Sequence, residues 1–258
     1  MRALVTGAGR RLGRAMAEYL GTRGYDVAIH YASSDKGAKE AAEVIRASGQ
    51  KAVPLQANLL DESETAALLS HAADALGGPI TCLVNNASIF EPDRIASATK
   101  ESWDRHIGSN LRAPYILIQQ MAAQVPDPDT DTNGEPVAKG LIINMVDQRV
   151  LKLTPHFSTY TIAKMGLWAL TRTAAQDLAP RVRVNAIGPG PTMQGDRQSK
   201  EHFEAQRQAT ILKRGADPDG IIAALGYLLD ARAVTGQLIC VDGGQHLAWE
   251  TPDIIGPE

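Results

Sequence analysis

The chain has 258 residues, of which 44% are hydrophobic and 21% charged, and its formal net charge is −3. This balance suits one sizeable folded domain spanning 1–258, and its mild acidity gives no support for a nucleic-acid partner. No run of about 18 apolar residues predicts a membrane span, and no apolar segment near the N-terminus has the length of a signal peptide. We therefore expect a cytoplasmic protein.

Strand-like and helix-like segments alternate along the whole chain. Short apolar runs predict strands at 3–7, 26–31, 51–59, 79–88, 140–146, 181–191 and 237–244. Apolar residues at helical spacing predict a helix after the first strand and further helices at 36–49, 61–77, 99–124, 155–178 and about 217–230. This alternation predicts an α/β fold of the Rossmann type, with one doubly wound parallel sheet of about seven strands and helices on both faces.

One segment interrupts the alternation of strands and helices, whereas both cysteines lie within predicted strands. Residues 126–136 are rich in Pro, Asp and Thr, and we expect a surface loop there, with a tolerated insertion as the simplest interpretation. Cys82 and Cys240 each lie in a predicted strand, which indicates buried free thiols in a reducing compartment. Without a CxxC pair or a Cys/His spacing, no metal site is predicted.

The segment TGAGRRLG (6–13) joins the first strand to the first helix. Doubly wound proteins bind a dinucleotide pyrophosphate at this point, on the positive end of the helix. Gly7 permits the tight turn, and Gly13 lets the helix pack closely on the sheet. Arg11 stands where a glycine is more usual.

The second strand ends at His30 and Tyr31, with no acidic residue to bind the ribose hydroxyls of NAD. Arg10 and the hydroxyls of Ser33 and Ser34 suit the additional phosphate of NADP, so we infer that NADPH is preferred. The alternative is that Arg10 is a solvated surface residue. The full set of predicted cofactor-binding residues is Gly7, Arg10, Arg11, Leu12, His30, Tyr31, Ser33, Asn58, Leu59, Asn86, Ala87, Ser88, Tyr160, Lys164, Pro189 and Gly190.

Tyr160 and Lys164 are four residues apart in a predicted helix, which puts both side chains on one helix face. An ammonium beside a phenol favours the phenolate and lowers the pKa of the Tyr from its usual value of about 10. Such a Tyr is a proton donor suited to neutral pH. Because a pair with this spacing is also common on helix surfaces, the interpretation depends on the other motifs.

Those motifs resemble the short-chain dehydrogenase/reductase family over nearly the whole chain. The matching segments, in the order of the family, are TGAGRRLG, NNAS (85–88), Asn110, Tyr160-x-x-x-Lys164, the PG at 189–190 and VDGG (241–244). The resemblance implies that Lys164 also binds the nicotinamide ribose and that Asn110 orders a water chain behind it.

A narrower resemblance is to the pteridine reductases, including dihydromonapterin reductases. Arg11, Ser88, Phe90 and Asp147 carry it, together with SNLRAPYIL (109–117). In that subgroup the Arg and Ser help to hold pterin and cofactor, the Phe stacks the pterin against the nicotinamide, and an Asp replaces the usual Ser thirteen residues before the Tyr. The subgroup often has an Arg just after the second strand, where this chain has Ala-Ser-Ser, which weakens the prediction of NADPH without reversing it.

Asp147 argues against the reduction of a simple ketone. An ionised Asp cannot donate a hydrogen bond to a carbonyl, and its charge opposes a developing alkoxide. A pterin C=N bond needs a proton at nitrogen when hydride arrives at carbon, and we expect Tyr160 to supply it with assistance from Asp147. The predicted catalytic residues are Asp147, Tyr160, Lys164 and Asn110, although Asp147 could instead only cap the turn after the fifth strand.

The predicted substrate-binding residues are Arg11, Ser88, Phe90, Asp147, Tyr160 and Met193. A flat Phe90 would suit a planar heterocycle, with a plain core residue as the alternative. From the family resemblance, the polar stretch 190–214 is a mobile lid carrying Met193. The tail 248–258, with Trp249, would then reach a neighbouring subunit of a homotetramer or, failing that, a dimer. We expect structural or solvent-facing roles for His106, His156 and His202.

Three functions remain open on the sequence alone. The first is an NADPH-dependent pterin reductase. The sequence does not identify which pterin it uses or whether it also reduces dihydrofolate. The second is a generic carbonyl reductase acting on ketones or 3-oxoacyl groups, which Asp147 disfavours. The third is a catalytically idle NADP(H)-binding regulator, which the presence of Tyr160 and Lys164 disfavours.

Overall fold

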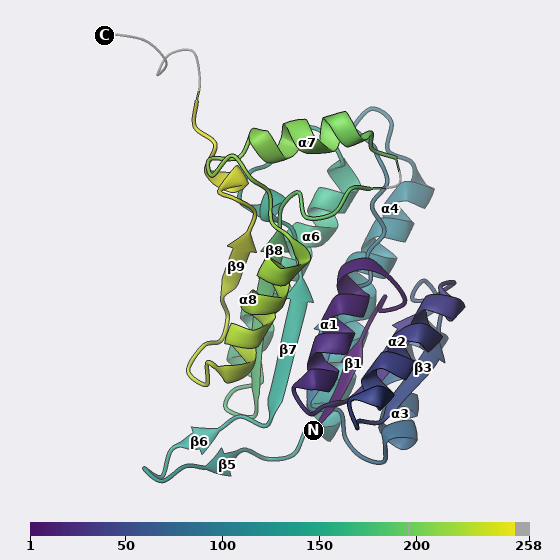
Figure 1. Cartoon of the computed structure of the whole chain (residues 1–258), viewed down its shortest axis with the longest axis vertical. Coiled ribbons are helices and arrows are strands. Elements are labelled where there is room, and N and C mark those ends of the chain that lie inside the picture. The colour runs from purple at the N-terminus through teal and green to yellow at the C-terminus, as the bar shows by residue number, and fades with distance from the viewer. Residues whose placement is uncertain (196, 251–258) are drawn as a thin grey trace.

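The computed structural model describes residues 1–195 and 197–250. Its main sheet contains the strands β1 (Arg2–Val5), β2 (Asp26–Tyr31), β3 (Ala52–Gln56), β4 (Cys82–Asn85), β7 (Gly140–Met145), β8 (Val182–Pro189) and β9 (Leu238–Val241). Their order in space is β3-β2-β1-β4-β7-β8-β9, and all pairs are parallel (Figure 1). The predicted doubly wound sheet is confirmed.

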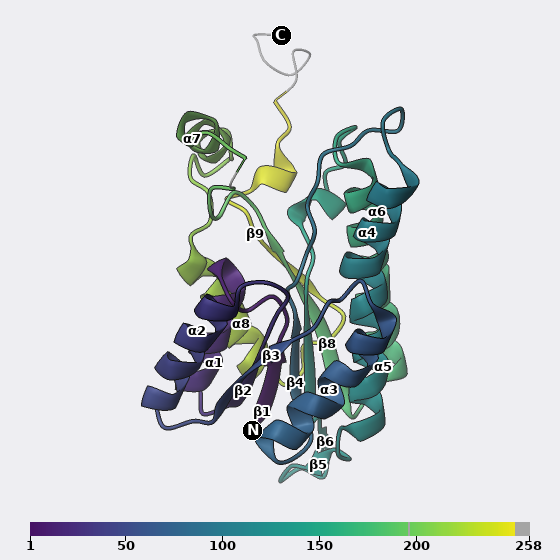
Figure 2. The ribbon, with the colours of Figure 1, turned by 90° about the vertical axis from the view of Figure 1, so that its right-hand side faces the viewer.

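Helices cover both faces of this sheet, as Figure 2 shows. One face carries α1 (Arg11–Thr22), α2 (Asp35–Ala47) and α8 (Pro218–Asp230), and the other carries α3 (Glu62–Leu76), α5 (Ala113–Gln124) and α6 (Ser158–Asp177). Two further helices, α4 (Lys100–Ile107) and α7 (Lys200–Gln208), lie toward the carboxyl ends of the strands.

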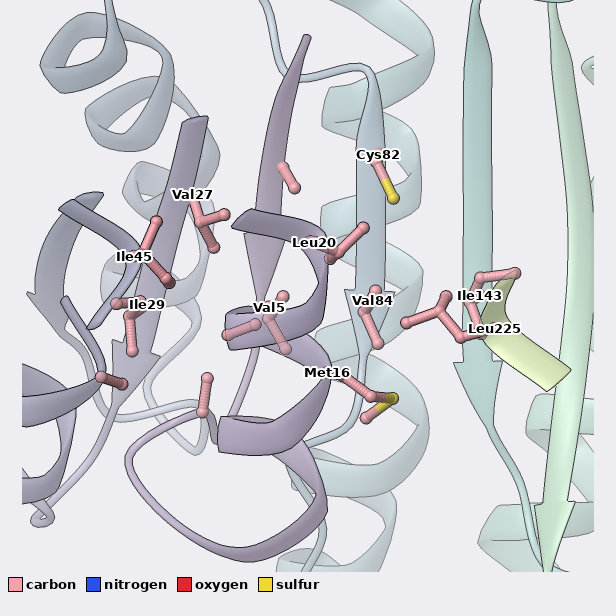
Figure 3. Close-up of a cluster of buried hydrophobic side chains, with 14 of the residues drawn as sticks. Val5, Met16, Leu20, Val27, Ile29, Ile45, Cys82, Val84, Ile143 and Leu225 are labelled. Atoms are coloured by element: carbon pink, nitrogen blue, oxygen red, sulfur yellow. The ribbon is translucent and has the colours of Figure 1, made fainter. Parts of the chain in front are cut away.

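The strands are apolar at consecutive positions because both of their faces are buried. On the α1 side, Val5 and Val84 pack with Met16, Leu20 and Leu225 in one cluster (Figure 3). A second cluster fills the space between the opposite face of the sheet and α3, α5 and α6.

The order of the strands fixes where a ligand can bind. From β1 the chain first adds β2 and β3 on one side, and then returns to place β4 on the other side of β1. In open α/β sheets the crevice at such a reversal, outside the carboxyl ends of the strands, is the usual binding site.

The predicted helix at 99–124 is interrupted in the structure. A π-helical segment, Gly108–Arg112, separates α4 from α5. π-Helical turns are rare and are frequently found at functional sites. This one contains the buried Asn110, whose side chain both donates to and accepts from the backbone of Ile89, each at 2.8 Å.

Three other boundaries differ from the predictions. The segment 126–136 is not a plain loop, because Asp129–Thr130 (β5) and Pro136–Val137 (β6) pair as a small antiparallel hairpin apart from the main sheet. The predicted lid 190–214 contains α7, which its polar sequence concealed. The helix predicted from Pro155 begins only at Ser158, because Phe157 before it has a left-handed backbone (φ 58°).

Cys82 is buried and free, as predicted, whereas the free Cys240 is only partly buried. In the part of the chain that the structure describes, no helix combines the length and the apolar character needed to cross a membrane. Of the predicted tail, 251–258 lies outside the described residues, and Trp249 is about half exposed.

Gly13 fixes how closely α1 approaches the end of β1. A Cβ atom at this position would lie 2.3 Å from the carbonyl oxygen of Gly7 and 2.5 Å from the side-chain nitrogen of Asn86. Such contacts force the backbone apart, so glycine is required here for steric reasons.

We therefore predict that Gly13→Ala lowers the free energy of unfolding by about 1–3 kcal/mol, the usual cost of overpacking. Thermal unfolding should show a decrease in Tm of roughly 5 °C for a chain of this size. Gly195→Ala is the matched control, because a Cβ atom there meets nothing within 4 Å. Equal Tm values for the two variants would contradict this steric role.

Candidate active site

A cleft of about 480 Å³ opens at the carboxyl ends of β1, β2 and β4. Most of the predicted cofactor residues line it together: Gly7, Arg10, Arg11, Leu12, His30, Tyr31, Ser33, Asn58, Leu59, Asn86, Ala87 and Ser88. Tyr160, Lys164, Pro189 and Gly190 are not among the residues that line this cleft. The structure thus brings together, from four segments far apart in sequence, the residues predicted to bind a dinucleotide.

The turn at Gly7 is built for close approach of a ligand to the backbone. Gly7 has a left-handed backbone (φ 63°), and a Cβ atom there would lie 2.9 Å from the Cα atom of Ala87. The Asn86 side chain donates to the carbonyl oxygen of Thr6 at 2.9 Å and so ties the end of β4 to this turn. The free amide groups of the first turn of α1 follow directly and suit an anionic pyrophosphate.

His30 supports the same turn from below. Its Nδ1 accepts a hydrogen bond from the backbone N–H of Gly7 at 3.0 Å, and its Nε2 lies 3.0 Å from the carbonyl oxygen of Ala57. Nε2 must therefore carry the proton, which makes this buried ring neutral. Burial lowers the pKa of His30, against the opposing effect of the bond to Ala57.

The end of β2 carries no acid of its own, but one lies close by in α2. The Tyr31 hydroxyl donates to Asp35 at 2.8 Å, and Lys39 contacts the other oxygen of this carboxylate at 2.7 Å. Asp35 is thus already paired, and Ser33 and Arg10 remain among the residues that line this part of the cleft.

Three of the predicted catalytic residues, Asp147, Tyr160 and Lys164, meet at the carboxyl end of β7, whereas Asn110 forms its hydrogen bonds with Ile89. The Tyr160 hydroxyl donates to Oδ2 of Asp147 at 2.8 Å, while Oδ1 accepts the backbone N–H of Arg149 at 2.8 Å. Lys164 donates to the carbonyl oxygen of Met145 at 2.7 Å, and its nitrogen lies 5.7 Å from the centre of the Tyr160 ring. Tyr160 and Lys164 are both buried. Asp147 therefore caps the turn with one carboxylate oxygen and accepts a hydrogen bond from Tyr160 with the other.

The expectation that Lys164 lowers the pKa of Tyr160 is wrong for this geometry. Burial, the charge of Asp147 and the hydrogen bond to Asp147 together raise the pKa of Tyr160 well above 10. The opposing influences are the charge of Arg149 and a hydrogen bond with Ser88. Burial also lowers the pKa of Lys164 to about 8, although Asp147 raises it. Tyr160 is consequently held in its neutral, proton-carrying form.

Phe90 lies beside Tyr160, with ring centres 4.7 Å apart and the planes at 70°. One face of Phe90 is already stacked on Phe157, at 4.2 Å and 11°. Phe90 is nevertheless 43% exposed, so it is not a plain core residue. The sequence analysis did not identify Phe157 or Arg149 as site residues. Their positions close to Asp147 and Tyr160 in the segment 147–160 could have indicated them.

Arginines hold the predicted lid over this site. Arg11, which has a left-handed backbone (φ 55°), donates to the carbonyl oxygens of Gln194 at 2.6 Å and Met193 at 3.0 Å. Arg197 donates to the carbonyl oxygen of Phe90. Arg11 thus contacts the lid by way of Met193 and also lines the cofactor cleft, which connects the two regions.

The remaining predicted residues have structural surroundings. Gly190 packs against Asp242, so the PG and VDGG motifs lie side by side at the ends of β8 and β9. His106 is buried between Thr159 and the backbone N–H of Glu91. Within residues 1–195 and 197–250, no cluster of His, Cys, Asp and Glu could hold a metal ion.

Comparison with known proteins places this site among oxidoreductases. A family model described as enoyl-(acyl carrier protein) reductase matches residues 7–246. The chain is 44% identical to FolM alternative dihydrofolate reductase 1 from Brucella suis, solved in complex with NADP, with a TM-score of 0.90 and 98% of each chain covered. It is 33% identical to the 3-oxoacyl-[acyl-carrier-protein] reductase FabG of Staphylococcus aureus, over 95% of this chain and 98% of that protein. It is 31% identical to pteridine reductase 1 of Leishmania tarentolae, over 95% and 96%.

The neutral state of His30 predicts a pH dependence of stability. Because its pKa is lower in the folded chain than the unfolded value of about 6.5, this contribution to stability is complete above that pH and decreases as the pH falls toward the folded-state pKa. The slope for one proton is at most about 1.4 kcal/mol per pH unit. His30→Asn keeps an acceptor near Gly7 but cannot titrate, so its urea midpoint should fall less than that of the wild type between neutral and mildly acidic pH. If the urea midpoint decreases equally in both proteins, groups other than His30 cause the pH dependence of stability.

The contact between Asp147 and Tyr160 predicts the effect of removing one charge. In Asp147→Asn the amide keeps a hydrogen-bonding partner for the hydroxyl, but the negative charge is lost, so the pKa of Tyr160 should fall. The tyrosinate absorbance of this variant, minus that of Asp147→Asn/Tyr160→Phe, isolates Tyr160 from the other tyrosines. The same difference between the wild type and Tyr160→Phe gives the reference pKa. If the pKa of Tyr160 in Asp147→Asn is equal to or higher than this reference, burial and not the charge of Asp147 sets it.

Proposed function

Because the chain belongs to the short-chain dehydrogenase/reductase family, we propose that it is an NADPH-dependent reductase of pterins. The resemblance to a dihydrofolate reductase solved with NADP and to a pteridine reductase supports this proposal. So does the cleft beneath the glycine-rich turn, which has the position and backbone geometry that a dinucleotide needs. Bound NADPH supplies a hydride to the carbon of the substrate's C=N bond.

The observation that carries the proposal is the hydrogen bond of 2.8 Å from Tyr160 to Asp147. Because both oxygens of Asp147 accept hydrogen bonds, from Tyr160 and from the backbone N–H of Arg149, the side chain offers a substrate no donor. A carboxylate charge here destabilises the alkoxide that forms when a ketone is reduced. A C=N nitrogen that takes up its proton before or together with the hydride carries positive charge at that stage, and the same carboxylate stabilises it. Asp147 therefore favours the reduction of C=N over that of C=O.

Tyr160 is the proton donor in this scheme. Its pKa, raised by burial and by Asp147, keeps it protonated until it transfers the proton to the substrate nitrogen. Once Tyr160 has released its proton, the neighbouring carboxylate makes the tyrosinate unfavourable and promotes uptake of a new proton. Lys164 would contact the nicotinamide ribose, and Asn110, on its π-helical turn, would order the water that returns the proton.

Phe90, Ser88, Arg11 and Met193 would form the substrate side of the site. Phe90 is partly exposed beside Tyr160, and an aromatic ring there suits offset stacking with a flat heterocycle. Ser88 is close enough to Tyr160 to oppose the rise in its pKa, and Arg11 connects the cofactor cleft to the lid at Met193.

We also propose a homo-oligomer, a tetramer or otherwise a dimer, in the cytoplasm. Apolar and aromatic side chains are exposed on the outer surface of α4, α5 and α6: Trp103, Tyr115, Ile162 and Met165. These helices lie on the same side of the sheet, which supports a contact between copies of the chain.

Exchange of the carboxylate for a hydroxyl tests the proposed function. Asp147→Ser should lower kcat/KM for dihydrobiopterin or dihydromonapterin by about 10- to 100-fold, the usual range for one group acting in proton transfer, and should raise any ketone reduction. The loss of NADPH absorbance measures both rates, and Thr154→Ser serves as a conservative control in the same segment. Unchanged pterin reduction by Asp147→Ser, or reduction of ketones but not pterins by the wild type, would indicate a generic carbonyl reductase.

A further inference from the structure

Arg149 lies next to the catalytic pair, but the scheme above gives it no contact with a substrate. It belongs to a short 3₁₀ turn, Gln148–Val150, that directly follows Asp147. Its backbone N–H holds Oδ1 of Asp147 at 2.8 Å, and its guanidinium donates to the hydroxyl of Thr154 at 2.5 Å. The guanidinium carbon lies 5.2 Å from the centre of the Phe157 ring.

The donors of Arg149 are largely unused. Its buried Nε–H has no hydrogen-bond partner in the described part of the chain, and no carboxylate among the described residues forms an ion pair with it. A partly buried guanidinium with free donors is costly unless a ligand supplies acceptors. A planar group with several donors is also the side chain best suited to bind a carboxylate in two places.

An unbroken series of contacts connects this cation to the proton donor. Arg149 lies over Phe157, Phe157 stacks on Phe90, and Phe90 contacts Tyr160, with successive separations of 5.2, 4.2 and 4.7 Å. The left-handed backbone of Phe157 is unusual for a residue of this size and costs about 1–2 kcal/mol. Strain of this kind persists where the surrounding structure holds a residue in a functional position. The series of contacts thus runs from the reacting group at one end to a positive charge at the other.

We propose that Arg149 is a specificity-determining residue that binds a carboxylate on the substituent of the pterin ring. With the pterin beside Phe90 and Tyr160, an aromatic substituent would lie along Phe157, and its terminal carboxylate would meet Arg149. The site then prefers a dihydropterin with an aromatic, carboxylate-terminated tail, such as dihydrofolate, to one with an uncharged hydroxylated side chain. This inference rests on the proposed function.

Dihydrofolate and dihydrobiopterin share the reacting ring but differ in the substituent. Comparing them distinguishes binding of the carboxylate by Arg149 from a general effect of Arg149 on the site. Arg149→Met removes the charge and keeps most of the apolar length, and Arg149→Lys keeps the charge without the planar donors. For Arg149→Met, KM for dihydrofolate should rise about 10- to 100-fold, the range for loss of a charged hydrogen-bonding group, while KM for dihydrobiopterin stays within about threefold. Arg149→Lys should restore part of the affinity for dihydrofolate.

Arg172→Met is the matched control, since Arg172 also lies over an aromatic ring, that of Trp168 at 5.9 Å, further along α6. It should leave both KM values unchanged. Salt should weaken the binding of dihydrofolate by the wild type more than by Arg149→Met, because only the wild type forms an ion pair. Equal losses for the two substrates, or an unchanged KM for dihydrofolate, would overturn the proposal.

Equilibrium binding keeps the test independent of turnover. Oxidised folate and biopterin can be titrated calorimetrically into the NADP⁺-loaded protein, whether or not it reduces their dihydro forms. Tighter binding of folate that is lost in Arg149→Met supports the assignment even if turnover fails. Binding of folate that does not depend on Arg149 refutes the assignment even if pterin reduction is observed.

Discussion

The hydrogen bond between the Tyr160 hydroxyl and the Asp147 carboxylate is the interaction on which the site depends. Its two partners come from α6 and from the end of β7, so its length of 2.8 Å requires that helix and strand keep their relative positions. The packing of α6 against the sheet and the bond from Lys164 to the carbonyl oxygen of Met145 maintain this relation. A charge-assisted bond in such a buried place contributes about 1.5–3 kcal/mol and orients the only proton that the scheme uses.

Electrostatics is the basis on which the proposed pterin reductase is distinguished from a ketone reductase. A carboxylate beside Tyr160 raises the energy of every additional negative charge nearby, including a tyrosinate and an alkoxide. The same carboxylate stabilises a protonated nitrogen. Arg149, anchored by its backbone to the other oxygen of Asp147, is the nearby cation that partly offsets this effect. Identity of about a third to a 3-oxoacyl reductase is therefore compatible with the proposed reduction of a different bond.

Local rules and the family resemblance were sufficient to predict the sheet, the glycine-rich turn and many of the residues that line the cleft. Gly7 and Gly13 could be placed because their constraint is a turn and a close approach that only glycine permits. The spacing of Tyr160 and Lys164 likewise predicted one helix face. These features depend on neighbours in sequence, or on the regular geometry of parallel strands.

Features that depend on tertiary packing could not be predicted in this way. The pKa of Tyr160 was expected to fall, yet it rises, because burial and Asp147 outweigh a lysine that lies over the ring and not at the hydroxyl. The π-helical turn at Asn110 is invisible in the apolar pattern, which continues through it. Phe157 was not predicted because its left-handed backbone and its stacking on Phe90 are determined by the packing of two segments that are distant in sequence.

The most direct test of the proposed function is the kcat/KM of the wild-type protein with NADPH for a dihydropterin and for a panel of simple ketones. The account predicts turnover of the dihydropterin with little or none of the ketones, and efficient reduction of ketones without that of the dihydropterin would contradict it.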